Sequence, residues 1–371
     1  MVPTSRITAV YRVAATASTV DARAQALAVE QSVEMPLEAI SDARVLSEVV
    51  GRVEGIDESG AGQFLVRLGL ATETTGHEAG QLMNMLFGNA SILDDVALVD
   101  LDLPEDLRRS FAGPGHGVDG IRARLGVPRR ALTASALKPQ GLPPDGLGDL
   151  AARMVEGGLD LIKDDHGLAD QTSAPFAARV GAVAARLEPM GALDRDLPSL
   201  SGNLDQLRAQ LRIAADHGVR GALVAPMVVG LPSFHTLVRE HPDVIFMAHP
   251  ALAGVSRIAP PVLLGSLYRL CGADATVFPH HGGRFGYCPE TCEALAHAAR
   301  RTWPPLAGCL PVPAGGMSLE RVEDMLTSYG PDVMLLIGGA LLVAGDDLVR
   351  EASGFRHRVE QVTERLVGRE A

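Results

Sequence analysis

The sequence predicts an α/β protein in which a C-terminal (β/α)8 barrel, the TIM-barrel fold, follows a small N-terminal α+β domain of the ferredoxin-like type. Short apolar runs alternate with helical stretches over the last ~250 residues, as in eight-stranded barrels. Polar side chains follow the ends of most of these runs. The first ~110 residues show a different order of elements and end in a Gly/Pro-rich stretch at 112–117. We therefore expect an N-terminal domain at 1–115 and a barrel at 116–371.

The N-terminal elements are predicted from hydrophobic periodicity. Residues 6–13 and 62–70 alternate as strands do, while 20–31 and 77–87 have helical spacing. A further short strand-like run covers 97–102. Together these elements predict a mixed α+β module.

The barrel strands are predicted from short apolar runs bounded by turn residues. Proline 198 interrupts the third run, which makes it the weakest strand of the set. Helical stretches such as 203–217 and 319–329 separate the runs. The eight runs are 131–137, 159–163, 197–201, 221–226, 244–248, 274–279, 309–312 and 333–337.

Composition excludes several classes of partner. The net charge of −12 and the lack of a basic stretch argue against a nucleic acid or an anionic membrane as partner. No apolar run reaches the ~18 residues of a membrane span, and the N-terminus does not resemble a signal peptide. Only four cysteines occur in 371 residues, so we expect a reduced, cytoplasmic protein.

Polar or glycine residues follow six of the eight predicted strands. Barrel geometry brings the carboxyl ends of all strands to one mouth, where barrel enzymes have their active sites. These segments should therefore converge on one site. They are Lys138, Lys163-Asp164-Asp165-His166, His249, residues 280–284, Gly315-Gly316 and Gly338-Gly339.

Two motifs carry a resemblance to a known family. With the sequence GGLDLIKDD at 157–165, Leu137-Lys138-Pro139 and the Gly/Pro-rich linker, the chain resembles the RuBisCO large-subunit superfamily over nearly its whole length. The resemblance implies that Lys163 is carbamylated by CO2. It also implies that the carbamate and Asp165 bind a divalent metal, that Lys138 assists enolisation and that His249 lies at the site.

The resemblance extends to substrate binding and assembly. It implies that the turns Gly315-Gly316 and Gly338-Gly339 bind phosphate through their backbone. It also implies that Glu30 and Asn89 complete the active site of a neighbouring subunit. The expected assembly is accordingly an antiparallel homodimer with shared active sites, and higher oligomers remain open.

Several positions depart from the CO2-fixing pattern. The glutamate that follows the two aspartates in the family is His166 here, and the second lysine after the first strand is Gln140. Pro250 replaces an arginine, and Val277 stands where a phosphate-binding histidine is expected. The loop with the CO2-polarising lysine is replaced by residues 278–285. The chain therefore resembles a RuBisCO-like protein (form IV), not a CO2-fixing carboxylase.

His166 leaves the identity of the metal open. Mg²⁺ prefers oxygen ligands, whereas imidazole suits Zn²⁺, Mn²⁺ or Fe²⁺. The site then holds Mg²⁺ more weakly, holds another ion, or does not use His166 as a ligand. Mg²⁺ is the first expectation and Mn²⁺ the next. Alternatively, Lys163 forms an ion pair with Asp164 or Asp165 and no metal binds.

The loop after the sixth strand carries further candidates. Arg284 suits a substrate carboxylate or phosphate, and the alternative is a salt bridge to Glu290 or Glu293. His280 and His281 either reach substrate or belong to the loop alone. The segment from Cys288 to Cys292, with His280, His281 and His297, suggests zinc, but the spacing is not standard and a helix beginning near Pro289 explains it as well.

These residues predict a metal-dependent enolising enzyme for a phosphorylated keto-sugar acid. The first expectation is a decarboxylase or transcarboxylase/hydrolase of a 3-oxo sugar-acid phosphate, of the 3-oxo-isoapionate 4-phosphate type. Loss of CO2 from a β-keto acid needs only the half of the site that is retained. One alternative is an enolase or isomerase of methylthio-pentulose phosphates in sulfur salvage, and another is a non-catalytic binding protein on an inherited barrel.

Overall fold

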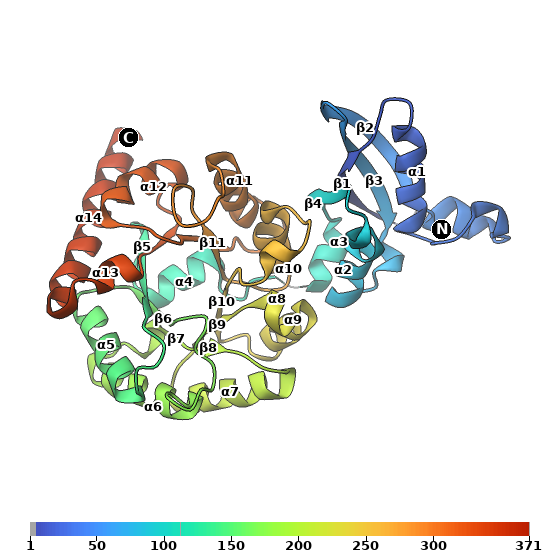
Figure 1. The fold of residues 1–371 in the computed structure, drawn as a ribbon. Coiled ribbons are helices and arrows are strands. Elements are labelled where there is room, and N and C mark those ends of the chain that lie inside the picture. The colour runs from blue at the N-terminus through green and yellow to red at the C-terminus, as the bar shows by residue number, and fades with distance from the viewer. Residues whose placement is uncertain (1–4, 112, 371) are drawn as a thin grey trace.

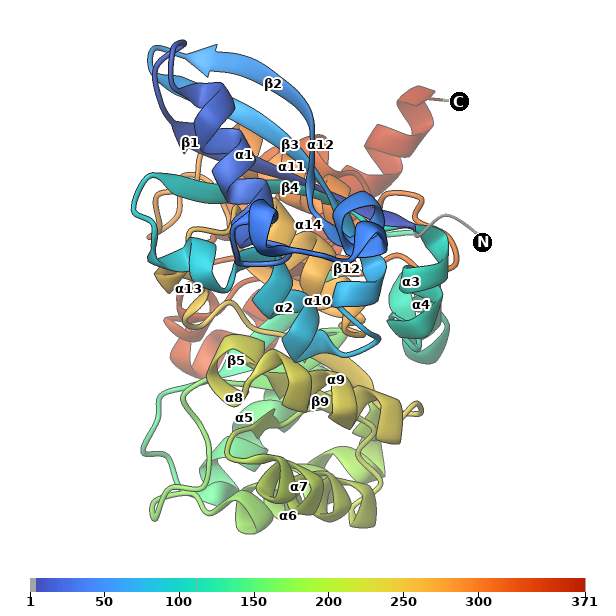
Figure 2. The ribbon, with the colours of Figure 1, turned by 90° about the vertical axis from the view of Figure 1, so that its right-hand side faces the viewer.

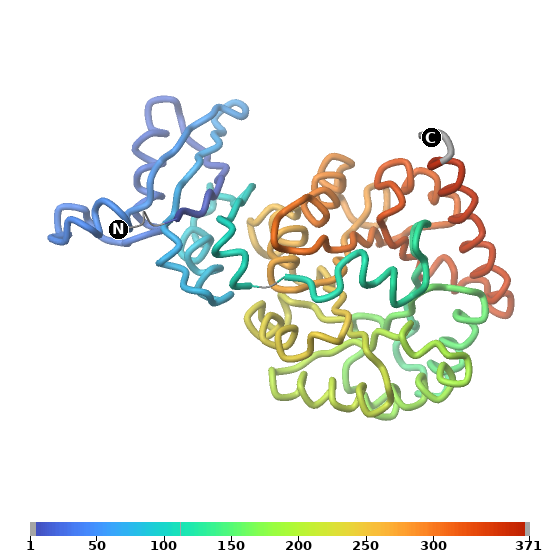
Figure 3. Tube along the Cα trace, turned by 180° about the vertical axis from the view of Figure 1, so that it is seen from behind, coloured from blue at the N-terminus to red at the C-terminus, as the bar shows by residue number. Residues whose placement is uncertain are grey.

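The computed structural model of the chain describes residues 5–111 and 113–370, with the side chains of 368–370 excepted. A four-stranded N-terminal sheet is followed by a ring of strands surrounded by helices (Figure 1). The same arrangement is seen from behind in Figure 3. Ala112, in the predicted linker, lies outside the described residues. The boundary at 115/116 stays a prediction.

The N-terminal domain has the ferredoxin-like order of elements. Its four strands form an antiparallel sheet in the order β2-β3-β1-β4, and Figure 2 shows α1 lying across one face. Alternate residues of β1 are buried, including Tyr11, whose hydroxyl donates to the Leu86 carbonyl at 2.6 Å. The elements are β1 (Arg6–Ala14), α1 (Val20–Glu30), β2 (Arg52–Gly60), β3 (Gln63–Ala71), α2 (Ala79–Phe87), β4 (Val96–Asp102) and α3 (Glu105–Phe111).

Strand β2 is the one N-terminal strand that the sequence did not predict. Its residues, RVEGIDESG, are mostly exposed and lack a regular apolar alternation. It pairs only with β3, at the edge of the sheet. Charged residues are common on such edges because they discourage pairing with other chains. Hydrophobic periodicity could not detect this strand, because its edge position leaves most of its side chains exposed and polar.

The eight predicted barrel strands are all present. Every pairing between them is parallel. Pro198 divides the third strand into two short pieces, β7 and β8, and β12 lies beside β13 to complete the ring. The strands are β5 (Leu132–Leu137), β6 (Leu161–Asp164), β7 (Asp196–Leu197), β8 (Ser199–Leu200), β9 (Gly221–Val224), β10 (Ile245–Ala248), β11 (Ala275–Pro279), β12 (Leu310–Ala314) and β13 (Met334–Leu336).

Helices between the strands form the outer layer of the barrel (Figure 1). The predicted helices at 203–217 and 319–329 correspond to α7, which begins at a capping box of Asn203 and Gln206, and to α12. No helix in the described part of the chain is long and apolar enough to cross a membrane. The barrel helices are α4 (Gly117–Leu125), α5 (Pro144–Glu156), α6 (Phe176–Leu187), α7 (Leu204–Asp216), α8 (Pro226–Val229), α9 (Leu231–Glu240), α10 (Tyr268–Leu270), α11 (Pro289–Arg300), α12 (Val322–Tyr329), α13 (Gly339–Leu342) and α14 (Leu348–Glu370).

The barrel interior is filled by one side chain in two along each strand. Leu132, Leu161, Ile245 and Met247 belong to one buried apolar cluster inside the ring. Because successive side chains of a strand point to opposite faces, Lys163 shares the inward face with Leu161, and His249 shares it with Met247. The interior packing thus determines which polar residues reach the mouth.

Asp164 points outward from β6 into a buried ion pair. Arg179 of α6 donates from Nε to Asp164 Oδ2 at 2.9 Å, and the two side chains are 1% and 2% exposed. The Ser199 amide donates to the same oxygen at 2.9 Å. Burial raises the pKa of Asp164, and the charge of Arg179 opposes that rise. The pair ties β6 to α6 and to the third strand.

We expect Arg179→Ala to lower the free energy of unfolding by about 3–5 kcal/mol, because it leaves the Asp164 carboxylate buried without its partner. Urea titration followed by circular dichroism measures the change. The matched control is Arg186→Ala on the same helix, whose pair with Asp149 is exposed and should contribute only about 0–1 kcal/mol. Equal effects of the two substitutions would show that the buried pair does not stabilise the barrel as described.

Candidate active site

The ends of β5, β6 and β10 bring five of the predicted site residues together. Asp165 is in contact with Lys138 Nζ through Oδ2, and Oδ1 lies 3.1 Å from Nδ1 of His166. The rings of His166 and His249 are stacked, with centroids 4.2 Å apart and planes 9° apart. The electrostatic environment of Lys163 includes both Asp165 and Lys138. The predicted convergence at one mouth is thus observed for these residues.

Lys163 is a buried amine with a depressed pKa. Its residue is 4% exposed, and Nζ donates to the Asp164 carbonyl at 2.9 Å. Burial and the charge of the neighbouring Lys138 lower the pKa to about 8, against the opposing effect of Asp165 and Asp164. An amine with that pKa is about half neutral at pH 8, whereas an ordinary lysine is almost fully charged. Only the neutral amine is nucleophilic, so Lys163 is chemically suited to attack CO2.

Asp165 is held as a carboxylate. Burial would raise the pKa of Asp165, but hydrogen bonds from His166, Lys138 and the Gly167 amide outweigh that effect and lower it well below the usual range. The Gly167 amide donates to Oδ1 at 2.9 Å. The group therefore keeps its negative charge over the physiological pH range.

His249 is held as a neutral imidazole. Burial lowers its pKa to about 2, and the charges of Lys163 and His166 act in the same direction. The Ala251 amide donates to Nδ1 at 3.2 Å, which places the single ring proton of the neutral form on Nε2. His249 can therefore donate a hydrogen bond to a substrate oxygen without carrying a charge.

The sequence interpretation did not assign a role to Gly167. A Cβ on Gly167 would lie 1.9 Å from Nε2 of Gln140 and 3.5 Å from Oδ1 of Asp165, so a larger residue there would require the exposed Gln140 side chain to move. Gln140, which occupies the position of the family's second lysine, thus packs against the turn that hydrogen-bonds Asp165. The signal in the sequence was a glycine directly after Lys163-Asp164-Asp165-His166.

Arg284 lies against the Gly315-Gly316 turn. Its amide donates to the Gly315 carbonyl at 2.8 Å, and both glycines have a φ of +95°, a left-handed conformation that favours glycine. A Cβ on Gly316 would lie 2.9 Å from Cγ of Arg284. Among the described residues, Arg284 forms no ion pair, so the alternative pairing with Glu290 or Glu293 is not observed. Its guanidinium lies over the Phe285 ring.

The second glycine turn borders the lysine of the first strand. A Cβ on Gly338 would lie 3.9 Å from Cε of Lys138, and Gly339 begins the short helix α13. Gly338-Gly339 is therefore at the same mouth as Lys138. Backbone amides at such a turn suit a phosphate group.

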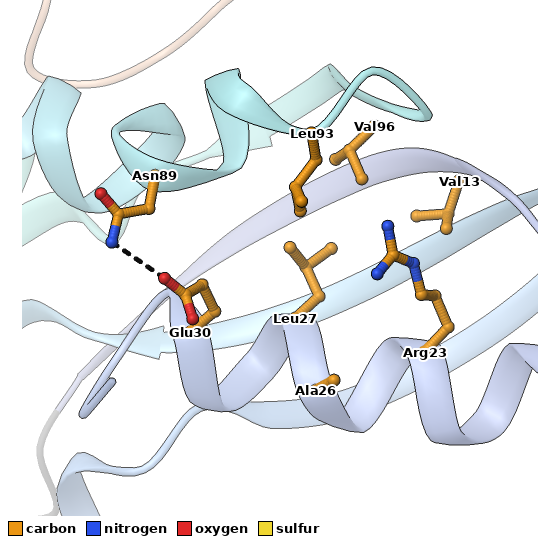
Figure 4. A pocket seen from close by; sticks show the side chains of 8 residues that line it. All are labelled: Val13, Arg23, Ala26, Leu27, Glu30, Asn89, Leu93 and Val96. Atoms are coloured by element: carbon orange, nitrogen blue, oxygen red, sulfur yellow. Dashed lines mark hydrogen bonds between the residues drawn. The ribbon is translucent and has the colours of Figure 1, made fainter. Parts of the chain in front are cut away.

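Glu30 and Asn89 lie in the N-terminal domain and not with the barrel strand ends. Asn89 Nδ2 donates to Glu30 Oε1 at 2.9 Å, and both line a cavity of about 240 Å³ between α1 and the turn at Asn89–Ile92 (Figure 4). Arg23 and Leu27 line the same cavity. The sequence prediction that these two residues act together is compatible with this pairing, and their predicted place in a partner's site stays a prediction.

Known proteins resemble the chain over nearly its full length. No protein-family model matches it. It is 60% identical to the 5-methylthioribulose-1-phosphate isomerase of Rhodospirillum rubrum, covering 95% of this chain and 96% of that protein. It is 54% identical to ribulose bisphosphate carboxylase-like protein 1 of Rhodopseudomonas palustris, covering 95% and 97%. It is also 31% identical to the 2,3-diketo-5-methylthiopentyl-1-phosphate enolase of Geobacillus kaustophilus, covering 82% and 76%.

Solved structures agree with these relatives. The Rubisco-like protein from Rhodopseudomonas palustris superposes with a TM-score of 0.89 at 49% identity, covering 96% of this chain and 98% of that one. These relatives confirm the resemblance to the RuBisCO large-subunit superfamily that the sequence motifs indicated. The chain belongs to the RuBisCO-like proteins of that superfamily, not to the CO2-fixing carboxylases, and it is an enzyme of the enolising type.

We expect two substitutions to move the pKa of Lys163 in opposite directions. Asp165→Asn removes a carboxylate that favours the charged amine, so the pKa should fall below about 8. Lys138→Met removes a positive charge that disfavours it, so the pKa should rise. Competitive acetylation in CO2-free buffer, with Lys163 followed by mass spectrometry across pH, measures both shifts. Shifts of the same sign would contradict the electrostatic arrangement.

Proposed function

We propose that the chain isomerises 5-methylthioribulose 1-phosphate in sulfur salvage. The 60% identity with the Rhodospirillum rubrum isomerase, over 95% of the chain, is the observation that carries the proposal. The relatives therefore support the methylthio-pentulose alternative better than the expected 3-oxo sugar-acid decarboxylase. That expectation rested on the half of the site that is retained, and Arg284, which suits a carboxylate or a phosphate, does not distinguish the two substrates. The non-catalytic alternative is not supported, because the relatives are named as enzymes.

The isomerisation requires only proton transfer next to a carbonyl. A base removes a proton from the carbon beside the C=O group, the resulting enediol is held, and a proton returns to the neighbouring carbon. No oxidant or reductant is consumed. Lys138, in contact with Asp165 at the mouth, is placed to carry a proton to or from the substrate. The neutral His249, with a proton on Nε2, stabilises the developing oxyanion by a hydrogen bond.

The donor set at the mouth fits a divalent metal. Carbamylation of Lys163 replaces a cation by an oxygen anion, and Asp165 stays ionised because its pKa is lowered. His166 lies directly beside Asp165 and adds a nitrogen donor. These three groups would hold Mg²⁺, or Mn²⁺ because of the imidazole. When bound, the metal would polarise the substrate's oxygens and so acidify the adjacent carbon.

The phosphate belongs at the glycine turns. Gly315 and Gly316, with Arg284 packed against them, offer amide groups and one unpaired guanidinium on one side of the mouth. Gly338-Gly339 offers a second turn beside Lys138. A substrate with one phosphate needs one of these turns, and the proximity of Arg284 favours Gly315-Gly316.

The active site is completed by a second subunit in this proposal. The family resemblance places Glu30 and Asn89 in the partner's site, and the Glu30–Asn89 hydrogen bond beside a cavity supports them as a preformed unit. The assembly is then a homodimer. A cytoplasmic location remains part of the proposal.

We expect purified protein with bicarbonate and Mg²⁺ to isomerise 5-methylthioribulose 1-phosphate. Lys163→Ala should abolish turnover, and Lys138→Met should lower kcat by about 10²–10⁴-fold, as loss of a proton-transfer group does. Phosphorus and proton NMR follow the product. In parallel, carbon-13 bicarbonate should give a carbamate resonance that Lys163→Ala lacks. Turnover of 2,3-diketo-5-methylthiopentyl 1-phosphate alone would favour the enolase activity named for the 31%-identical relative.

Shared sites predict complementation between inactive variants. Lys163→Ala and Asn89→Ala subunits are mixed, partially denatured for a short time and reassembled. About half of the dimers should then be mixed, and one of the two sites in each mixed dimer is intact, so activity should return to at most about a quarter of the wild-type value per site. Enzyme assays against each variant reassembled alone measure the gain. No recovery from verified mixed dimers would place Asn89 outside the partner's site.

A further inference from the structure

A second cluster of metal-binding side chains lies beyond the end of strand β11. His280 and His281 follow this strand, and Cys292 lies on helix α11. One ligand atom from each of the three residues lies within 4.8 Å of the others. Two imidazoles and a thiol at this separation form a preassembled set of soft donors, which is rare without a function. None of the three belongs to the Lys163 site.

The imidazoles in this cluster lack hydrogen-bond partners that burial would normally require. His280 is fully buried, and its Nε2 has no hydrogen-bond partner; the same is true of the buried Nδ1 of His281. A buried polar atom left unsatisfied costs about 1–3 kcal/mol. The other nitrogen of His280, Nδ1, lies 2.6 Å from the hydroxyl of Tyr329. An imidazole oriented through one nitrogen, with the other nitrogen free, is the usual arrangement of a metal-bound histidine.

His280 is neutral before a metal binds. Burial lowers the pKa of His280 to about 4, and the charges of His281 and Arg321 act in the same direction, so the ring is neutral at physiological pH. Burial raises the pKa of the Cys292 thiol, so the metal has to displace its proton. When a metal binds, the S–H bond breaks, the proton passes to solvent and a sulfur–metal bond forms.

A carboxylate lies beside the cluster but outside it. Oδ2 of Asp324, on α12, lies 3.8 Å from Nε2 of His280 and 3.7 Å from Nε2 of His281, and Arg321 binds the same oxygen at 2.6 Å. Two imidazoles and one thiolate are ligands found in protein Zn²⁺ sites.

We propose that His280, His281 and Cys292 bind one Zn²⁺ ion, whose fourth ligand comes from solvent. The ion would join the end of β11 to α11. It would thereby anchor the loop that carries Arg284, because the Gly283 amide donates to the His280 carbonyl at 3.3 Å and Arg284 follows directly. The site is a positioning device for Arg284 and does not touch the substrate.

The structure revises the interpretation of this segment from the sequence. Cys288 is exposed, and its sulfur lies 3.2 Å from the hydroxyl of Thr291, so it does not join the cluster. His297 lies in the last turn of α11 and is also outside it. The standard spacing of zinc ligands along a sequence does not apply here, because the ligands come from the end of a strand and from the second turn of a helix, and not from one short motif.

Cobalt substitution of the full chain tests the proposal. A thiolate bound to Co²⁺ gives a near-ultraviolet charge-transfer band, and tetrahedral Co²⁺ gives strong visible bands, whereas the Lys163 site has no sulfur ligand. We expect both features at one equivalent of Co²⁺, displaced by one equivalent of Zn²⁺. Cys292→Ser should remove the charge-transfer band, and Cys288→Ser, the matched control four residues earlier, should retain it. Lys163→Ala should retain it too.

A chelator competition and a Tm measurement test the zinc site independently of the cobalt spectrum. If Cys292→Ser fails to fold, judged by circular dichroism, His281→Gln takes its place and should weaken Zn²⁺ binding at least 10-fold in a chelator competition. Zn²⁺ should raise the Tm of Lys163→Ala, but not that of the double variant Lys163→Ala/His281→Gln, in which both metal sites are removed. The absence of a charge-transfer band in folded wild type, or its loss in Cys288→Ser alone, would overturn the proposal. Neither result bears on isomerase activity, which is assayed separately.

Discussion

The alternation of side chains along strand β6 is the constraint on which the active site depends. Lys163 and Asp165 face the barrel mouth, while Asp164 between them faces the outer helices. Each of the three side chains is buried, so its charge requires a partner. Arg179 pairs with Asp164, and Lys138 and His166 pair with Asp165. Lys163 donates to a backbone carbonyl, and because burial is not offset by a close ion pair, its pKa falls to about 8; this unequal pairing is the imbalance at the site.

The same imbalance favours the carbamate. A buried amine between another lysine and two carboxylates that already have partners gains little by remaining protonated. Conversion to an anion beside Lys138 turns a repulsion into an attraction. Asp165, whose pKa lies below the usual range, supplies a second anion at the same place. In the proposed enzyme a divalent cation would neutralise both anions, whereas the direct contacts of these residues form an ion-pair network.

Hydrophobic periodicity predicted the elements that are buried in the core, and it failed for elements and contacts that do not depend on apolar packing. The barrel strands and their polar ends followed from short apolar runs, and Pro198 was correctly expected to disrupt the third strand. Strand β2 was missed because an edge strand is polar. Arg179 was missed because a helix brings it to Asp164 from 15 positions away, which no local pattern encodes. The relatives favour the alternative substrate over the first expectation, because Arg284 suits a carboxylate and a phosphate equally and could not decide between them.

The loop after β11 explains how a RuBisCO-like site can dispense with gas addition. The family resemblance places a CO2-polarising lysine in this loop in true carboxylases, and such a lysine must be mobile to close over a substrate and a gas. Here the Arg284 amide donates to the Gly315 carbonyl, and the proposed zinc site would hold the loop at a second point. The proposed isomerisation has no gaseous second substrate, so it does not require this loop to move. A fixed Arg284 would hold the phosphate in one position while the proton moves between carbons, as catalysis by proximity requires.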